Sequence, residues 1–118
     1  MESGQATLAF TGDVMLGRGV GEVMKKEGPQ YPLGNTTVLL AEADLTFINL
    51  ECVISSRGKE WAQPPHAFYF RSDPIAVQVL RAAGIDYVTL ANNHVLDYGF
   101  DALRDTFQLL KEAGIQWA

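Results

Sequence analysis

Cysteine pairs, long apolar runs and a secretion-type leader are all lacking from this sequence. The single cysteine, Cys52, excludes an internal disulfide framework and a clustered thiolate zinc site. No apolar run approaches the roughly 18 residues that would suggest a membrane span, since stretches such as 67–70 are only strand-sized. Residues 1–5 contain neither a basic stretch nor an apolar core, so the sequence as given shows no export signal.

Basic residues are scarce as well. Nine Lys and Arg residues stand against fourteen Asp and Glu among 118 residues, which gives a formal net charge of −5. The basic residues are scattered along the chain, whereas nucleic-acid-binding domains carry a basic face, so nucleic acid is not an expected partner. What is abundant is apolar residues, at 47%, which is typical of a soluble globular domain whose core needs no disulfide or structural metal.

Short apolar runs predict strands at residues 7–11, 45–50 and 87–91. The first run ends in Gly12-Asp13, which indicates a buried strand stopped by a turn. The aromatic residues of 67–70 predict a further short strand. The polar segment 55–65, which contains Gly and Pro, predicts a loop.

Helices are predicted between these runs. The first places Val20, Val23 and Met24 on one face and ends at Gly28-Pro29; the second is short and runs from a cap at Thr36 or Thr37 to Ala43. The third opens with Asp73-Pro74, carries an apolar stripe of Ile75, Val79, Leu80 and Ala83, and ends at Gly84. The fourth presents Phe100, Leu103, Phe107 and Leu110 and ends at Gly114. Alternating strands and helices predict an α/β fold with a mainly parallel sheet.

A local repeat bears on where the domain ends. Residues 80–88 and 110–118 share one pattern, in which a helix end is followed by Gly, Ile, a polar residue and an aromatic residue. Trp117 therefore takes the place of Tyr87 at the start of a strand, yet the second copy stops at Ala118. We expect the single domain formed by 1–118 to be an N-terminal portion of a larger sheet. The alternative is that residues 115–118 form a docked tail.

Polar residues follow three of the predicted strands. They are Gly12-Asp13, Asn49-Leu50-Glu51 and Asn92-Asn93-His94. In parallel α/β sheets ligands bind beyond the carboxyl ends of the strands, where such loops converge. Carboxylate, amide and imidazole donors suit a divalent ion of the Mn, Fe, Zn or Mg group. Taken singly, each could be only a turn former or a solvated strand end, but their joint occurrence at successive strand ends favours a site.

Other polar residues have simpler interpretations. Asp97 precedes Gly99 and the fourth helix, which predicts an N-cap. His66 lies in a polar loop and is expected to be exposed or packed rather than a ligand. The glycine-rich segment 17–21 lacks the third glycine of a dinucleotide fingerprint, because Glu22 occupies its place. Arg18, at the start of a helix, could still hold an anionic group of a substrate.

Three segments carry a resemblance to a known family. They are Phe10-Thr-Gly-Asp-Val-Met-Leu-Gly-Arg18, Asn49-Leu-Glu51 and Ala91-Asn-Asn-His-Val-Leu-Asp-Tyr-Gly99. In order and spacing they resemble the bacterial capsule-synthesis proteins of the CapA/PgsA type, over nearly the whole chain from Thr7 to Ala118. That family is associated with poly-γ-glutamate production and has a calcineurin-like metallophosphoesterase fold.

The resemblance implies roles for individual residues. Asp13 corresponds to the first metal-binding Asp, Glu51 to the metal-bridging carboxylate and Asn93 to a ligand of a second ion. His94 corresponds to the histidine that contacts the substrate phosphate or protonates the leaving group, and Asn92, like Arg18, is expected to bind substrate. The superfamily's first motif is Asp-x-His, but here Met15 takes the histidine position. The later histidine motifs, including Gly-His-x-His, are not in the sequence, so we expect this chain by itself to be inactive.

These observations lead to three hypotheses of function. The first is that the chain is the N-terminal part of a protein of capsule or poly-γ-glutamate biosynthesis. Its reaction would be metal-assisted hydrolysis or transfer at a phosphate, ester or amide centre. The family resemblance implies that the parent protein is extracytoplasmic and membrane-associated. The second is a non-catalytic accessory subunit that binds an anionic polymer or steadies a membrane synthase. The third is an intracellular phosphoesterase unrelated to capsules. An incomplete sheet would leave an exposed edge, which favours a homodimer.

Overall fold

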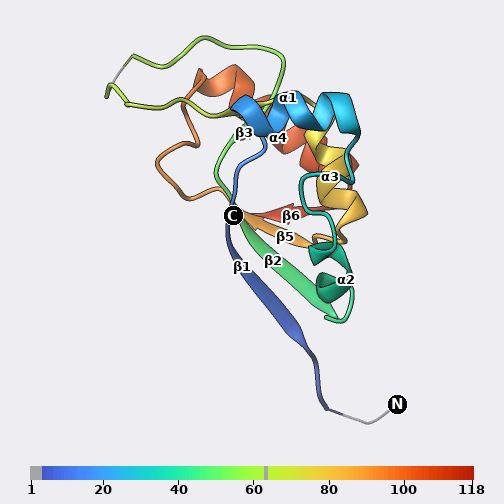
Figure 1. Ribbon diagram of the computed structural model, residues 1–118. Helices are drawn as coiled ribbons and strands as arrows, with labels where there is room; N and C mark the ends of the chain where they lie inside the picture. The colour runs from blue at the N-terminus through green and yellow to red at the C-terminus, as the bar shows by residue number, and fades with distance from the viewer. Residues whose placement is uncertain (1–3, 63) are drawn as a thin grey trace.

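The computed structural model describes residues 4–62 and 64–118 (Figure 1). The main sheet has four parallel strands in the order β1-β2-β5-β6, namely β1 (Leu8–Val14), β2 (Leu45–Leu50), β5 (Tyr87–Thr89) and β6 (Gln116–Trp117). A separate parallel pair joins β3 (Val53–Ile54) to β4 (Arg71–Ser72). The helices are α1 (Arg18–Glu27), α2 (Thr36–Leu40), α3 (Ala76–Ala82) and α4 (Gly99–Glu112). The predicted α/β fold with a mainly parallel sheet is confirmed.

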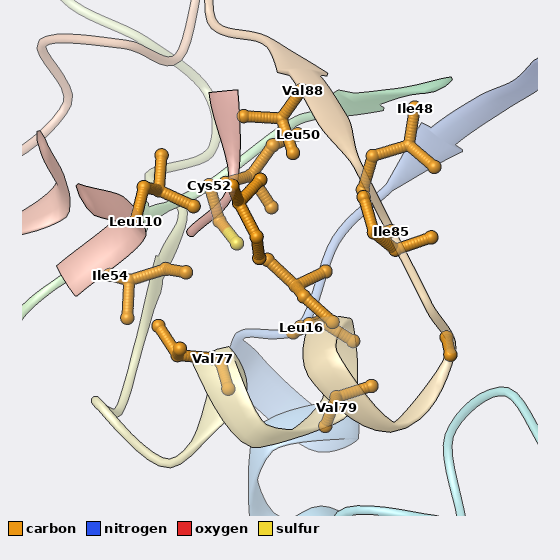
Figure 2. Packing of buried hydrophobic residues seen from close by; sticks show 14 of the residues in the cluster. Leu16, Ile48, Leu50, Cys52, Ile54, Val77, Val79, Ile85, Val88 and Leu110 are labelled. Atoms are coloured by element: carbon orange, nitrogen blue, oxygen red, sulfur yellow. The ribbon is translucent and has the colours of Figure 1, made fainter. Parts of the chain in front are cut away.

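The helices cover one face of the main sheet. The strand order β1-β2-β5-β6 runs in one direction across the sheet. Connections between parallel strands are nearly always right-handed, so connections that advance in one direction lie on the same face of the sheet. Each helix contributes to one core cluster with β2 and β5; its members include Met24, Leu40, Leu80 and Leu110 together with Ile48, Leu50 and Val88. Figure 2 shows part of this cluster, including Leu50, Val88 and Leu110. Strand β2 shows the corresponding alternation, with Thr46, Ile48 and Leu50 buried on the helix side.

The opposite face of the sheet carries a row of aromatic rings. Phe10 of β1 stacks on Phe47 of β2 with ring centroids 4.8 Å apart, and Phe47 lies 5.5 Å from Tyr87 of β5. Phe10 is 70% exposed. The prediction of a buried first strand is therefore wrong, because β1 lies at the edge of the sheet and its outward side chains lie on this open face. Association of two copies through an exposed edge of the incomplete sheet stays a prediction.

The predicted faces of α1 and α4 are rotated in the structure. In α1, Met24 is buried but Val20 and Val23 are not. In α4, Phe100 is exposed and the helix buries its small-residue side, which includes Thr106. The reason is a close contact with β3, where the Thr106 hydroxyl accepts a hydrogen bond from the backbone N–H of Ile54 at 2.9 Å. A small side chain at that position lets the helix approach the strand.

Three local predictions about where elements lie or begin need correction. Residues 67–70 form no strand; the short strand lies at β4 instead, directly after them, where it pairs with β3. Helix α2 spans Thr36–Leu40 instead of reaching Ala43, and its N-cap is Asn35 rather than Thr36 or Thr37. Helix α3 begins at Ala76 with Ile75 as its N-cap, so the predicted N-cap at Asp73 lies two residues too early; Asp73 Oδ1 accepts a hydrogen bond from Ile75 N at 3.0 Å in the turn that precedes the helix.

The sequence repeat corresponds to two copies of one helix–strand junction. Ile85 N donates to Leu80 O at 3.0 Å, and Ile115 N donates to Leu110 O at 2.9 Å. The glycine between them in each copy has a positive φ, 69° at Gly84 and 74° at Gly114. The second copy continues into β6, which pairs with β5, so residues 115–118 are not a docked tail. Continuation of the domain past Ala118 stays a prediction.

An ion pair joins the loop after β3 to α4. Arg57 donates from Nη2 to Asp105 Oδ1 at 2.7 Å, and Ser55 Oγ donates to Asp105 Oδ2 at 2.5 Å. The hydrogen bond from Arg57, followed by that from Ser55, lowers the pKa of Asp105 from 3.8 to about 2.

This pair predicts a small pH effect on stability. A carboxyl group whose pKa is lowered by folding stabilises the folded state above its unfolded pKa, and loses that contribution as the pH falls towards its folded pKa. Between about pH 4 and pH 2, the wild-type protein should lose slightly more stability than Asp105→Asn. The effect is small because the pair is largely exposed. Urea midpoints at both pH values measure it, and identical pH dependence of the two proteins would contradict it.

None of the helices in the part of the chain that the structure describes is long and apolar enough to cross a membrane.

Candidate functional site

The polar residues predicted to form a site meet at the carboxyl ends of β1, β2 and β5. Asp13 lies opposite Asn49 in the register of β1 and β2, and Glu51 follows directly after β2. Asn92, Asn93 and His94 follow β5 in a turn. The strand-end argument therefore brings Asp13, Glu51 and the 92–94 turn together, as expected.

An irregularity in β1 aims Asp13 into this site. Phe10 pairs with Phe47, but Asp13 pairs with Asn49, so β1 has one residue more than β2 between the two pairs. Without the extra residue, alternation would turn Asp13 towards the helix side. The bulge reverses this, so that Asp13 and Asn49 lie side by side on the same face. Asp13 is exposed there, which leaves its carboxylate accessible.

Asn49 connects the two carboxylates. Its Nδ2 donates to Asp13 Oδ1 at 2.8 Å and to Glu51 Oε1 at 2.7 Å. Residues 49 and 51 share one side of β2 because strand side chains alternate. Asn49 belongs to one of the polar segments that the sequence places at the ends of the predicted strands. Its position in the sequence does not show that its side chain donates hydrogen bonds to both carboxylates.

Asn92 ties the turn after β5 to β2. Its Nδ2 donates to Leu50 O at 2.9 Å and to Asn49 Oδ1 at 3.1 Å, while its Oδ1 accepts from His94 N at 3.0 Å. These bonds engage both ends of the Asn92 amide with the protein itself. Binding of substrate by Asn92 stays a prediction; what the geometry shows is that Asn92 fixes the turn that carries His94.

His94 is oriented by a buried carboxylate. Its Nδ1 lies 2.6 Å from Asp97 Oδ2, and Asp97 is fully buried. An ionised carboxylate only accepts hydrogen bonds, so in the neutral imidazole this contact favours the tautomer with the proton on Nδ1 and the lone pair on Nε2. Nε2 lies 3.3 Å from Asn93 Nδ2 and 3.9 Å from Glu51 Oε2. The imidazole therefore presents its reactive nitrogen to the carboxylate site.

The prediction that Asp97 caps the fourth helix is wrong. Helix α4 begins at Gly99 with Tyr98 as its N-cap, and no side chain caps it. Asp97 lies one residue too early and points inward, where Oδ2 also accepts from Phe70 N at 2.8 Å. The i to i+3 spacing of His94 and Asp97 in a turn was the signal in the sequence that could have indicated this pair.

Aromatic residues form a wall beside His94. The Phe70 ring lies 4.1 Å from the imidazole, and Phe68 stacks near Phe70 at 6.4 Å. The guanidinium of Arg18 lies 4.9 Å above the Phe68 ring, and Arg18 has a positive φ of 51°. His66 is partly buried; its Nε2 lies 3.6 Å from Asp97 Oδ1, and its ring lies 5.6 Å from Tyr69 and 5.8 Å from His94, so it is packed, which is one of its two expected roles. Arg18 is exposed at the far end of this wall, and its contact with a substrate stays a prediction.

Two neighbouring sulfur atoms do not contribute ligands. Met15 Sδ accepts a hydrogen bond from Gly17 N at 3.0 Å, so the thioether faces the backbone. Cys52 follows Glu51 but points into the core (Figure 2), where burial raises the pKa of its thiol to about 12. The thiol therefore stays protonated, which agrees with the expectation that it packs rather than forms a bridge.

The donor chemistry fits part of a site for a divalent cation. Asp13 Oδ2 and Glu51 Oε2 are the carboxylate oxygens that Asn49 leaves free, and His94 Nε2 lies 3.9 Å from the second, where it could act on a group bound to the ion. Oxygen and imidazole donors of this kind suit Mg, Mn, Fe or Zn. Within residues 4–62 and 64–118, however, no group of three or more His, Cys, Asp and Glu side chains is arranged to hold a metal ion. Asn93 as a further ligand stays a prediction.

Residues 7–118 match the family described as "Bacterial capsule synthesis protein PGA_cap". The chain belongs to this family. It is 28% identical over 98% of its length to the capsule biosynthesis protein CapA of Bacillus anthracis, of which it covers 28%. It is 32% identical over 93% of its length to a probable polyglutamine synthesis accessory protein of Mycobacterium tuberculosis, of which it covers 37%. It is 26% identical over 83% of its length to the PGA biosynthesis protein CapA of Bacillus subtilis, of which it covers 26%.

The resemblance to capsule-synthesis proteins of the CapA/PgsA type is thereby confirmed. The chain spans well under half of the length of each of these three curated relatives. The stretch that matches the family, from Thr7 to Ala118, includes every residue of the site described above.

Proposed function

We propose that this chain is the part of a capsule or poly-γ-glutamate biosynthesis protein that supplies a carboxylate and imidazole centre for metal-assisted hydrolysis or transfer at a phosphate, ester or amide group. The observation that carries the proposal is that Asp13 and Glu51 share one amide donor, with His94 Nε2 3.9 Å from Glu51. The names of the relatives support the biological process.

Each residue has a defined task in this proposal. Asp13 and Glu51 would hold a divalent ion, which when bound polarises an oxygen of the substrate or of water. His94 Nε2 exchanges a proton with the leaving group or attacking water, while Asp97 holds the ring and stabilises its protonated form. The aromatic wall excludes water on one side of the imidazole.

The test compares the full protein with two site variants. We expect hydrolysis of p-nitrophenyl phosphate, bis(p-nitrophenyl) phosphate or γ-glutamyl p-nitroanilide to depend on added Mn²⁺ or Zn²⁺. Asp13→Ala should abolish the metal-dependent rate, and His94→Ala should lower it by about 10²- to 10⁴-fold, the usual contribution of a general acid or base.

Glu22→Ala is the matched control, because it removes an exposed carboxylate of α1 and should leave the rate unchanged. Circular dichroism shows that the variants fold. If the full protein binds neither ion and both site variants keep the cellular function, the catalytic proposal fails.

A non-catalytic accessory role is the second candidate. It is favoured by the name of the mycobacterial relative and by Met15 in the place of an expected histidine ligand. In that role the protein would bind an anionic polymer or steady a membrane synthase, outside the cytoplasm and associated with the membrane. The net charge of −5 disfavours broad capture of a polyanion, which leaves Arg18 for a local contact. Polymer yield that falls in Arg18→Ala but not in Asp13→Ala would favour this role.

A further inference from the structure

The amide of Asn49 determines which oxygens the two carboxylates present. A primary amide has two N–H donors, and Asn49 directs Nδ2 to one oxygen of each neighbour, Asp13 Oδ1 and Glu51 Oε1. The second oxygen of each carboxylate is left without a bond to Asn49. Two negative groups on one face would otherwise repel each other and rotate apart, so the amide also keeps them close.

Asn49 is itself locked in this orientation. Its Oδ1 accepts a hydrogen bond from Asn92 Nδ2, and Asn92 is held by Leu50 O and His94 N. A half-turn of the Asn49 amide would point its oxygen at two carboxylates and its NH₂ group at the NH₂ group of Asn92. Both contacts would be repulsive, so the network allows only one orientation.

The lock also excludes Asn49 as a ligand in this arrangement. The only atom with which it could coordinate a cation is Oδ1, and that atom faces Asn92 rather than the carboxylates. Its contribution is therefore made through Asp13 and Glu51.

We propose that Asn49 is a positioning residue, which holds Asp13 and Glu51 so that Asp13 Oδ2 and Glu51 Oε2 are presented together to a divalent cation. This inference rests on the proposed function, because it concerns the same carboxylate site. Partners that orient metal-binding side chains without touching the metal typically contribute about 10- to 100-fold to its affinity. Loss of the amide donor should therefore weaken cation binding without removing any ligand.

The experiment measures Mn²⁺ binding to the full protein by isothermal titration calorimetry, with no substrate present. Asn49→Ala should raise the Kd about 10- to 100-fold. Asn49→Leu has a similar volume and no donor, so it should give the same loss and guards against an effect of packing. Asn49→Gln restores an NH₂ donor and should recover part of the affinity, which a merely structural role would not do.

Thr89→Ala is the matched control. Thr89 is paired with Asn49 across β2 and β5, yet its hydroxyl contacts only the backbone N–H of Ala91 among the described residues. It should bind Mn²⁺ like the wild type. The thermal midpoint without Mn²⁺ shows that each variant folds.

The outcomes separate the two proposals. If the wild type binds Mn²⁺ and Asn49→Ala and Asn49→Leu bind it equally well or more tightly, the positioning role is overturned while the proposed function stands. If the wild type and Thr89→Ala bind neither Mn²⁺ nor, in the same titration, Zn²⁺, the positioning role is overturned, and the catalytic proposal falls with it when Asp13→Ala and His94→Ala also keep the cellular function. A loss in Asn49→Ala and Asn49→Leu that Asn49→Gln partly reverses supports the role of Asn49.

Discussion

Replacing Asp97 with alanine is expected to lower the free energy of unfolding by about 3 kcal/mol. Asp97 is fully buried, and its Oδ2 accepts hydrogen bonds from His94 Nδ1 at 2.6 Å and Phe70 N at 2.8 Å. Alanine leaves both donors unpaired beside a small cavity. Urea unfolding followed by circular dichroism measures the loss, and a change of less than about 1 kcal/mol would contradict this account.

Two further variants separate stability from chemistry. Asp97→Asn keeps an oxygen that can accept both bonds, so it should cost less stability than alanine. It removes the negative charge that stabilises a protonated His94, so the metal-dependent rate should still fall strongly. Asp101→Ala is the control, because within residues 4–62 and 64–118 that exposed carboxylate pairs only with Arg104, so its loss should change stability by about 0.5 kcal/mol or less.

Gly17→Ala is expected to destabilise the protein by about 1–3 kcal/mol. A Cβ at this position would lie 2.5 Å from the carbonyl oxygen of Arg71, which belongs to the backbone and cannot turn aside. The start of α1 would have to move away from β4. That strand continues from Phe70, which packs on His94, so the change should also disturb the site.

Gly19→Ala is the matched control in the same helix. Gly19 is exposed and an added Cβ meets nothing within 4 Å, so alanine should stabilise α1 by up to about 1 kcal/mol. The two substitutions should shift the urea midpoint in opposite directions. Shifts of the urea midpoint that have the same sign and size in both variants would show that the close approach of Gly17 to Arg71 does not affect stability.

The fold was largely predictable from local pattern. The order of apolar runs and helix ends indicates a parallel α/β sheet, and the bounds of β2 were predicted to the residue. The burial of β1 and the faces of α1 and α4 were not predictable, because they depend on neighbours. Phe10 and Phe100 are apolar yet exposed, and Thr106 is polar yet buried, because β3 lies against it.

The sequence predicted which residues lie in the candidate site better than it predicted the hydrogen bonds between them. Strand-end reasoning places Asp13, Glu51 and His94 together, because parallel strands end at one edge. It cannot show that Asn49 bonds to two carboxylates or that Asp97 turns inward to His94, since both depend on side-chain direction in three dimensions. Gly12 within an apolar strand was the signal that could have indicated the bulge.

The bulge gives β1 two alternation phases. Before it, the even-numbered Phe10 faces the aromatic side and Ala9 packs on the core; after it, the odd-numbered Asp13 takes the aromatic side and Val14 packs on the core. A sequence alignment that shifts a single gap within residues 10–13 exchanges these phases. The residue that such an alignment matches to Asp13 in a relative would then be assigned to the wrong side of the sheet. Comparisons of this strand should therefore be anchored separately at Phe10 and at Asp13.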